Sequence, residues 1–122
     1  MESNETKFKF PRAKIDYYTL TYQILSYLFT CLKNGEKVDP EMLTHDSPLL
    51  DITEKYWHYL ITNLTAQEYV VGLDITYDDN NEVKSINVEN CVITPKGIEY
   101  IYNNTTAKKI YRFIKEAKSI TR

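Results

Sequence analysis

The sequence predicts an α+β domain with the winged helix-turn-helix fold. An amphipathic helical pattern over residues 53–67 is followed by two segments rich in Val, Ile, Thr and Tyr, over residues 69–77 and 83–93. A further helical segment with its own capping residue comes next. This order is typical of a recognition helix followed by its wing, so we expect a three-helix core, a two-stranded β-ribbon wing and two C-terminal helices.

The chain divides by charge into three parts. Residues 1–14 carry four basic and two acidic groups, residues 15–105 carry five and fourteen, and residues 106–122 carry six and one. We expect the first part to be an extended or disordered arm, because Pro11 blocks an early helix. We expect residues 15–105 to form the winged-helix domain and residues 106–122 to form a basic C-terminal helix packed on it. A basic tail is therefore joined to an acidic body, and the formal net charge is −2.

Two helices are expected before residue 53. Asp16 is a suitable N-cap for a helix that runs to about residue 33 and that Asn34-Gly35 ends. Apolar residues on more than one side of this helix predict the central core helix, or one that also forms a subunit contact. Asp39-Pro40 then begins a short second helix, which Ser47-Pro48 ends.

The third helix carries one buried and one outward face. The buried face repeats at helical spacing and comprises Trp57, Leu60, Ile61 and Leu64. At about 100° per residue, the positions that point away from the core are Lys55, Tyr59, Thr62 and Ala66, with His58 to one side. In a DNA-bound winged helix these outward positions would meet the major groove.

The two strand segments are joined by a polar turn. Asp78-Asp79-Asn80-Asn81 has turn chemistry and makes the tip of the ribbon acidic. Thr94-Pro95 then supplies an N-cap and a proline at the first helical position, which predicts a helix that Asn103-Asn104 ends. Thr105 or Thr106 caps the last helix.

Several segments of the chain resemble a known family. Residues 54–64, 68–72 and 93–104, followed by Ala107-Lys108-Lys109-Ile110, look like the YjcQ-like proteins of low-GC Gram-positive bacteria and their phages. The resemblance covers about residues 15–118. A sequence motif similar to Ile93, Thr94, Gly97 and Tyr100 follows the wing in MarR-like and PadR-like regulators. It implies a winged-helix fold and carries over no catalytic or ligand residue. Glu68 stands where the pattern usually offers glycine, which makes a left-handed helix C-cap less secure there.

The leading function hypothesis is a transcription-regulator-like protein, of prophage or host origin, that binds nucleic acid weakly or conditionally. The expected contacts come from the third helix, aided by basic residues at both termini. The candidate contact residues are Lys55, His58, Tyr59, Thr62, Lys84, Lys108, Lys109, Arg112 and Lys115. Duplex affinity rests largely on neutralising phosphates, about 6–10 of them in repressor-like contacts. The third helix offers only Lys55 against Glu54, and Lys84 alone offsets the acidic wing tip.

The alternative hypothesis is a protein-interaction module that uses the winged-helix scaffold with its acidic ribbon and tyrosine-rich surface. The basic helix of residues 106–122 has alternatives of its own: a site for a phosphate or an acidic partner, a solvated face, or a segment that docks on the acidic body of this chain or of a symmetry mate. We also expect a homodimer through the first and last helices.

The sequence does not favour catalysis, a cofactor or a metal site. His45-Asp46 and His58 have no third ligand at useful spacing, and there is no phosphate-binding or dinucleotide motif. Cys31 and Cys91 are interpreted as free, buried thiols. No run approaches the roughly 18 apolar residues of a membrane span, and the acidic N-terminus is unlike a secretory signal, so we expect a cytoplasmic protein.

Overall fold

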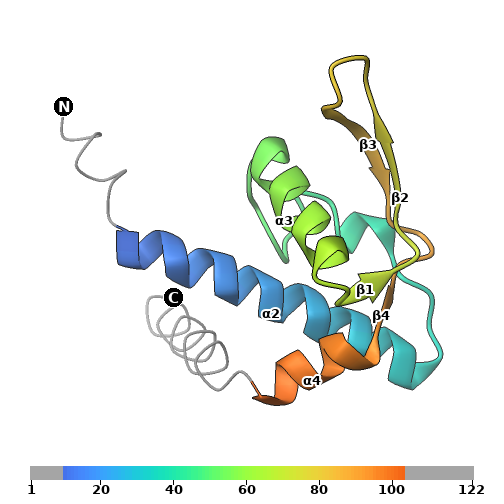
Figure 1. The fold of residues 1–122 in the computed structure, drawn as a ribbon. Coiled ribbons are helices and arrows are strands. Elements are labelled where there is room, and N and C mark those ends of the chain that lie inside the picture. The colour runs from blue at the N-terminus through green and yellow to red at the C-terminus, as the bar shows by residue number, and fades with distance from the viewer. Residues whose placement is uncertain (1–9, 104–122) are drawn as a thin grey trace.

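The computed structural model describes the backbone of residues 10–103 and the side chains of residues 17–103. Its elements, in order, are α2 (Phe10–Asn34), a single 3-10 turn η1 (Pro40–Met42), α3 (Glu54–Ala66), β1 (Val70–Val71), β2 (Asp74–Tyr77), β3 (Val83–Asn87), β4 (Val92–Ile93) and α4 (Pro95–Asn103). Figure 1 shows α3 on one side of α2 and α4 on the other, while β2 and β3 extend away from the helices. The α+β class is thus confirmed for the described part of the chain.

The first helix starts earlier than expected. It begins at Phe10 rather than after Asp16, so Pro11 lies in its first turn. Proline is tolerated there, because the first N–H groups of a helix have no intrahelical partner to lose. The expectation that Pro11 blocks a helix was therefore wrong, although the expected end is confirmed: Gly35 has φ +66°, and the Glu36 N–H donates to the Cys31 carbonyl over 2.9 Å.

The second helix is reduced to η1. Asp39 caps it as expected, since its Oδ1 accepts from the Glu41 N–H at 3.0 Å, but no helix continues to Ser47. Ser47 instead closes a tight turn, in which both its carbonyl and its hydroxyl accept from the Leu50 N–H, at 3.1 and 3.2 Å. Such local bonds compete with the helical pattern. The described residues therefore do not form the three full helices expected for the core.

The third helix has the expected bounds and faces. Thr53 is the N-cap, and its Oγ1 accepts from the Tyr56 N–H at 3.2 Å. The four buried residues are the predicted Trp57, Leu60, Ile61 and Leu64. At the other end Glu68 takes φ +65°, and the Tyr69 N–H donates to the Leu64 carbonyl over 3.0 Å, so the left-handed C-cap forms without glycine.

The expected single ribbon is divided into two antiparallel pairs. β1 pairs with β4, matching Val70 to Ile93, and β2 pairs with β3, matching Asp74 to Asn87. The division falls at Gly72, whose φ is +88° and where a Cβ would lie 2.0 Å from the Asn90 carbonyl oxygen. Only glycine fits such a close approach of two backbones.

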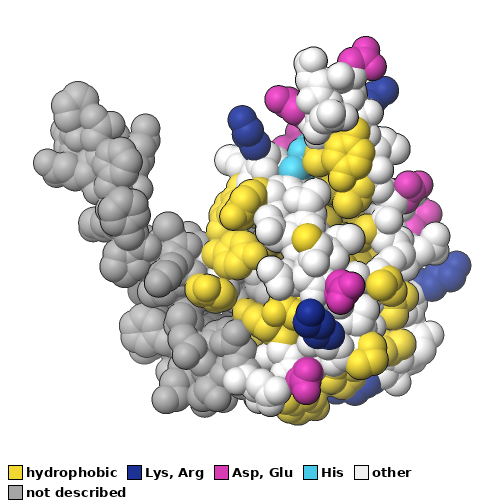
Figure 2. Space-filling view, in the orientation of Figure 1, with side chains coloured by type: hydrophobic (Ala, Val, Ile, Leu, Met, Phe, Trp, Pro, Cys, Tyr) yellow, Lys and Arg dark blue, Asp and Glu magenta, His cyan; other side chains and the backbone are white. Residues whose placement is uncertain are grey.

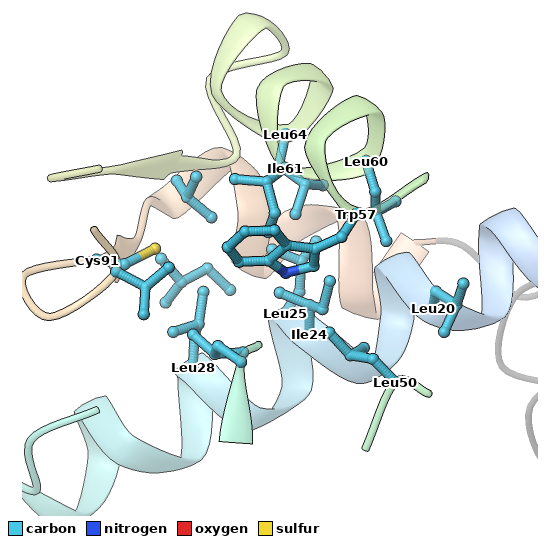
Figure 3. Close-up of a cluster of buried hydrophobic side chains, with 14 of the residues drawn as sticks. Leu20, Ile24, Leu25, Leu28, Leu50, Trp57, Leu60, Ile61, Leu64 and Cys91 are labelled. Atoms are coloured by element: carbon cyan, nitrogen blue, oxygen red, sulfur yellow. The ribbon is translucent and has the colours of Figure 1, made fainter. Parts of the chain in front are cut away.

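The core lies between α2 and α3 and is closed by the β1–β4 pair and α4. Figure 3 shows the Trp57 ring among side chains of α2 and α3. α2 buries residues on a broad face, as expected for a central core helix. The buried apolar residues are Leu20, Ile24, Leu25, Leu28, Cys31, Leu43, Leu50, Trp57, Leu60, Ile61, Leu64, Val70, Val88, Cys91, Ile93 and Ile101. In the described range, no helix has the length and apolar character to cross a membrane.

Candidate interaction surface on the third helix

Four predicted contact residues lie on the solvent side of α3. Lys55 and Tyr59 are exposed, with Tyr59 61% exposed, while His58 and Thr62 are half-buried. We call these four residues the α3 face. The helical period places these residues on one side of α3, and the burial of Trp57, Leu60, Ile61 and Leu64 on the opposite side agrees with that.

Hydrogen bonds within the helix occupy several polar groups of this region. Thr62 Oγ1 lies 2.8 Å from the His58 carbonyl oxygen and 3.1 Å from that of Tyr59, so its hydrogen stays on its own helix. Asn63 Nδ2 donates to the same Tyr59 carbonyl over 2.7 Å. His58 Nε2 lies 4.0 Å from a carboxylate oxygen of Glu54. The Lys55 ammonium and the Tyr59 side chain are therefore the main features of the α3 face.

Tyr59 of the α3 face lies near tyrosines of α2, of α4 and of the segment between α3 and β1. The Tyr17 ring centroid lies 6.3 Å from that of Tyr59 and 5.4 Å from that of Tyr18, and the Tyr69 and Tyr100 centroids are 5.0 Å apart. We call these five residues the tyrosine cluster. Burial first, and the neighbouring tyrosines second, raise the pKa of Tyr17, and the same causes raise the pKa of Tyr100 to about 12. Both phenols are therefore neutral at physiological pH.

The predicted wing cation lies in an irregular part of the ribbon. Tyr77 pairs with Val83 and Thr76 with Ser85, so Lys84 has no residue opposite it. At the tip, the Asp78 carboxylate accepts from the Asn80 and Glu82 N–H groups at 2.8 and 3.0 Å. Asp78 thus stabilises the turn by hydrogen bonding its backbone. Lys84 belongs to a different element from the α3 face.

The described surface carries few cations. Residues 17–103 include five basic side chains, Lys33, Lys37, Lys55, Lys84 and Lys96, and thirteen acidic ones. Figure 2 shows basic and acidic side chains scattered singly over this view, with exposed hydrophobic side chains between them. Over the described part of this view no continuous basic patch extends from α3. The predicted contacts Lys108, Lys109, Arg112 and Lys115 lie outside the described residues.

The two cysteines meet at a different place in the fold. Both are free and buried, as predicted, and both line one hollow between the C-terminal end of α2 and β4. Burial raises the pKa of Cys91 to about 12, so this thiol is protonated at neutral pH and unreactive. Over the described range, no three His, Cys, Asp or Glu side chains group in a way that could hold a metal ion.

Comparison with known proteins places the chain in a family. The model of the YjcQ family, described as YjcQ protein, matches residues 22–120, which is most of the chain. The chain belongs to the YjcQ family. No curated protein and no solved structure matches it. Membership in this family was predicted from the segments around α3, β1 and α4, and it is confirmed.

A tyrosine-rich surface was expected, but the members of the tyrosine cluster and their contacts were not predicted. The sequence shows eleven tyrosines, but their spacing does not reveal that Tyr17 of α2 and Tyr59 of α3 approach each other. The available signal was the excess of tyrosine itself, together with the outward position of Tyr59.

Proposed function

We propose that the chain is a winged-helix protein that binds another protein through its α3 face and the adjoining tyrosine cluster. In this assignment α3 is the recognition helix and the β2–β3 ribbon is the wing. The observation that carries the proposal is the nature of the α3 face: a mostly exposed Tyr59 packed against Tyr17, with Lys55 as its single cation. Tyrosine is enriched at protein interfaces, because its ring supplies apolar area and its hydroxyl supplies a hydrogen bond.

Charge favours a protein partner over a duplex. A repressor-like contact neutralises about 6–10 phosphates. If α3 and the wing faced DNA, the described basic residues on them would be Lys55 on α3 and Lys84 on the ribbon. The tip of the ribbon would add the acidic residues Asp78, Asp79 and Glu82. Those carboxylates would lie beside a backbone of the same sign, which costs binding energy.

A second candidate function is nucleic-acid binding. It is favoured by the six basic residues of positions 106–122 and by the exposed position of Lys55 on the assigned recognition helix. This candidate requires the basic residues to supply most of the phosphate contacts. Retention of labelled genomic fragments would then fall steeply with salt.

Site-specific photocrosslinking in cells separates the two candidates. Tyr59 is replaced by a photoreactive phenylalanine, and the crosslinked products are treated separately with nuclease and with protease. We expect a discrete adduct whose size is unchanged by nuclease, because the α3 face contacts protein. An adduct that nuclease shortens would contradict the protein proposal and support nucleic-acid binding.

Tyr102 is the matched control position. It is 61% exposed, as Tyr59 is, but its ring centroid lies 6.2 Å from that of Phe29 on α2 and it is not part of the tyrosine cluster. It comes two residues after Tyr100 on α4, so the two side chains point to opposite sides of that helix. The same photoreactive residue at position 102 should give no discrete adduct. Equal adducts at both positions would show that capture reflects exposure alone, and the proposal would then fail.

A further inference from the structure

The hollow at the C-terminal end of α2 has an apolar floor and a charged rim. Its volume is about 250 Å³, and its floor is formed by Leu28, Cys31, Val38 and Cys91. At its mouth Leu32 and Val92 are 49% and 41% exposed. Val71, paired with Val92 in the sheet, is 54% exposed and extends the apolar surface. Apolar side chains that gather in this way mark a place where another apolar group can be buried.

The size of the hollow suits one side chain better than a small molecule. Sites for drug-sized ligands measure about 300–1,000 Å³. A single aromatic ring is smaller and can insert as an anchor. The rim adds the exposed carboxylates Glu36 and Glu89, next to Lys37. The hollow therefore matches an aromatic side chain that has cations on both sides.

The chain itself contains such a segment. Lys7-Phe8-Lys9 places one aromatic ring between two lysines and directly precedes α2. The sequence of positions 107–117 instead has apolar residues at helical spacing, a pattern that predicts a stripe broader than one hollow can hold.

Phe8 cannot reach the hollow of its own molecule. Leu28 lies 18 positions after Phe10 in the same helix, so about 27 Å separate the two positions at 1.5 Å per residue. Phe8 precedes Phe10 by two residues, which span about 7 Å at most. Figure 1 shows the start of α2 and β4 at opposite ends of that helix. If Phe8 fills the hollow, it must therefore come from another molecule.

We propose that the hollow binds Phe8 of a second copy of this chain, with Lys7 and Lys9 of that copy beside Glu36 and Glu89. Two copies with antiparallel α2 helices place each N-terminal segment at the hollow of the other. The exchange is reciprocal and closes as a dimer with twofold symmetry. This contact is separate from the α3 face, and it is tested without any other partner.

Sedimentation equilibrium of the full-length chain tests the proposal through the dimer dissociation constant. Phe8→Ala removes the anchor and should weaken the dimer by about tenfold or more. Lys7→Glu with Lys9→Glu should also weaken it, as should Glu36→Lys with Glu89→Lys. Combining all four substitutions restores opposite charges across the contact, and the dissociation constant should return to within about threefold of the original.

Two controls make the result decisive. Lys55→Glu with Lys84→Glu changes the net charge by as much as the lysine pair at positions 7 and 9, and it should leave the dimer intact. Lys108→Glu with Lys109→Glu in the full-length chain makes the same change of charge in the basic tail and should also leave the dimer intact. A monomeric wild-type chain, an unchanged dissociation constant for Phe8→Ala, or a dimer weakened as much by either control pair as by Lys7→Glu with Lys9→Glu would each overturn the proposal.

Discussion

Tyr100 shows how one side chain can combine good packing with an unpaired polar atom. Its ring lies against that of Tyr69, yet its hydroxyl oxygen is buried with no hydrogen-bond partner. Within the described residues, Thr19 Oγ1 and Trp57 Nε1 share this condition. A buried polar group that loses water and gains no partner costs about 1–3 kcal/mol.

Replacing Tyr100 by phenylalanine should therefore stabilise the protein. Tyr100→Phe keeps the ring and removes the unpaired hydroxyl, so the free energy of unfolding should rise by about 1 kcal/mol. Urea titration followed by the fluorescence of the single tryptophan, Trp57, measures this change. Tyr77→Phe, at a position 55% exposed, is the control and should be nearly neutral. A loss of stability in Tyr100→Phe would show that the hydroxyl is hydrogen-bonded.

Glu68 holds a backbone conformation that suits glycine. Its φ of +65° lies in the left-handed region, which is unfavourable for a residue with a Cβ. Its carboxylate makes only an exposed ion pair with Lys96, at 3.9 Å. Glu68→Gly should raise the free energy of unfolding by about 0.5–1 kcal/mol. Glu68→Ala removes the ion pair and keeps the Cβ, so denaturant unfolding of that variant should show almost no gain. Equal gains in both variants would assign the effect to charge instead of backbone strain.

At the scale of elements, the start of α4 joins the end of α3. Thr94 caps α4 by accepting from the Gly97 N–H at 3.0 Å, and the same hydroxyl donates to the Glu68 carbonyl over 2.7 Å. The Thr94 N–H donates to the Tyr69 carbonyl over 3.0 Å. These bonds fix α4 against the segment that leaves α3. They also bring Tyr100 of α4 next to Tyr69.

The junction depends on the absence of a side chain at Gly97. A Cβ there would lie 2.4 Å from the Tyr69 carbonyl oxygen and 2.7 Å from Cγ1 of Ile93. Gly97→Ala should therefore lower the free energy of unfolding by about 1–3 kcal/mol, measured by thermal and urea unfolding. Gly35→Ala is the matched control: its Cβ meets open space, and its φ of +66° costs only about 1 kcal/mol. Equal losses at the two positions would contradict steric overlap at Gly97.

At the scale of the whole molecule, stability should depend on alkaline pH. Burial raises the pKa of Cys91 from 9.0 and that of Tyr100 from 10.0, each to about 12. Above about pH 9 the unfolded chain loses protons that the folded chain retains. Deprotonation of these two groups therefore does not reduce the free energy of unfolding at neutral pH. The free energy of unfolding falls progressively as the pH rises from about 9 toward 12.

Urea unfolding at neutral pH and between about pH 9 and pH 11 measures this dependence. The double variant Cys91→Ala with Tyr100→Phe lacks both groups, so its free energy of unfolding should fall less over that interval. Comparing the slopes of the free energy of unfolding against pH removes any pH-independent effect of the two substitutions on packing. Parallel slopes in the variant and the wild-type chain would contradict the assignment.

The parts of the fold that depend on neighbouring residues in the chain were well predicted. Thr94 as the cap of α4 and the buried stripe of α3 follow from spacing within a few residues. For α3 the sequence offered Asp51 or Thr53 as the cap, and the structure shows Thr53. The shared side of Lys55, Tyr59 and Thr62 follows from the same helical period. Errors arose where local signals compete, as at Pro11, which is compatible with both a helix start and an extended arm.

The sequence by itself determined family membership, the bounds and faces of α3, and the separation of a basic tail from an acidic body, because these properties are local or are simple counts. Only the tertiary structure decided that η1 replaces the second helix, that Gly72 divides the ribbon and that Tyr17 meets Tyr59. It also brought Cys31 and Cys91 to one hollow. At η1, turn hydrogen bonds around Ser47 replace the helix. The other features depend on contacts between residues distant in the chain, where the close packing of a small core selects among several locally acceptable conformations.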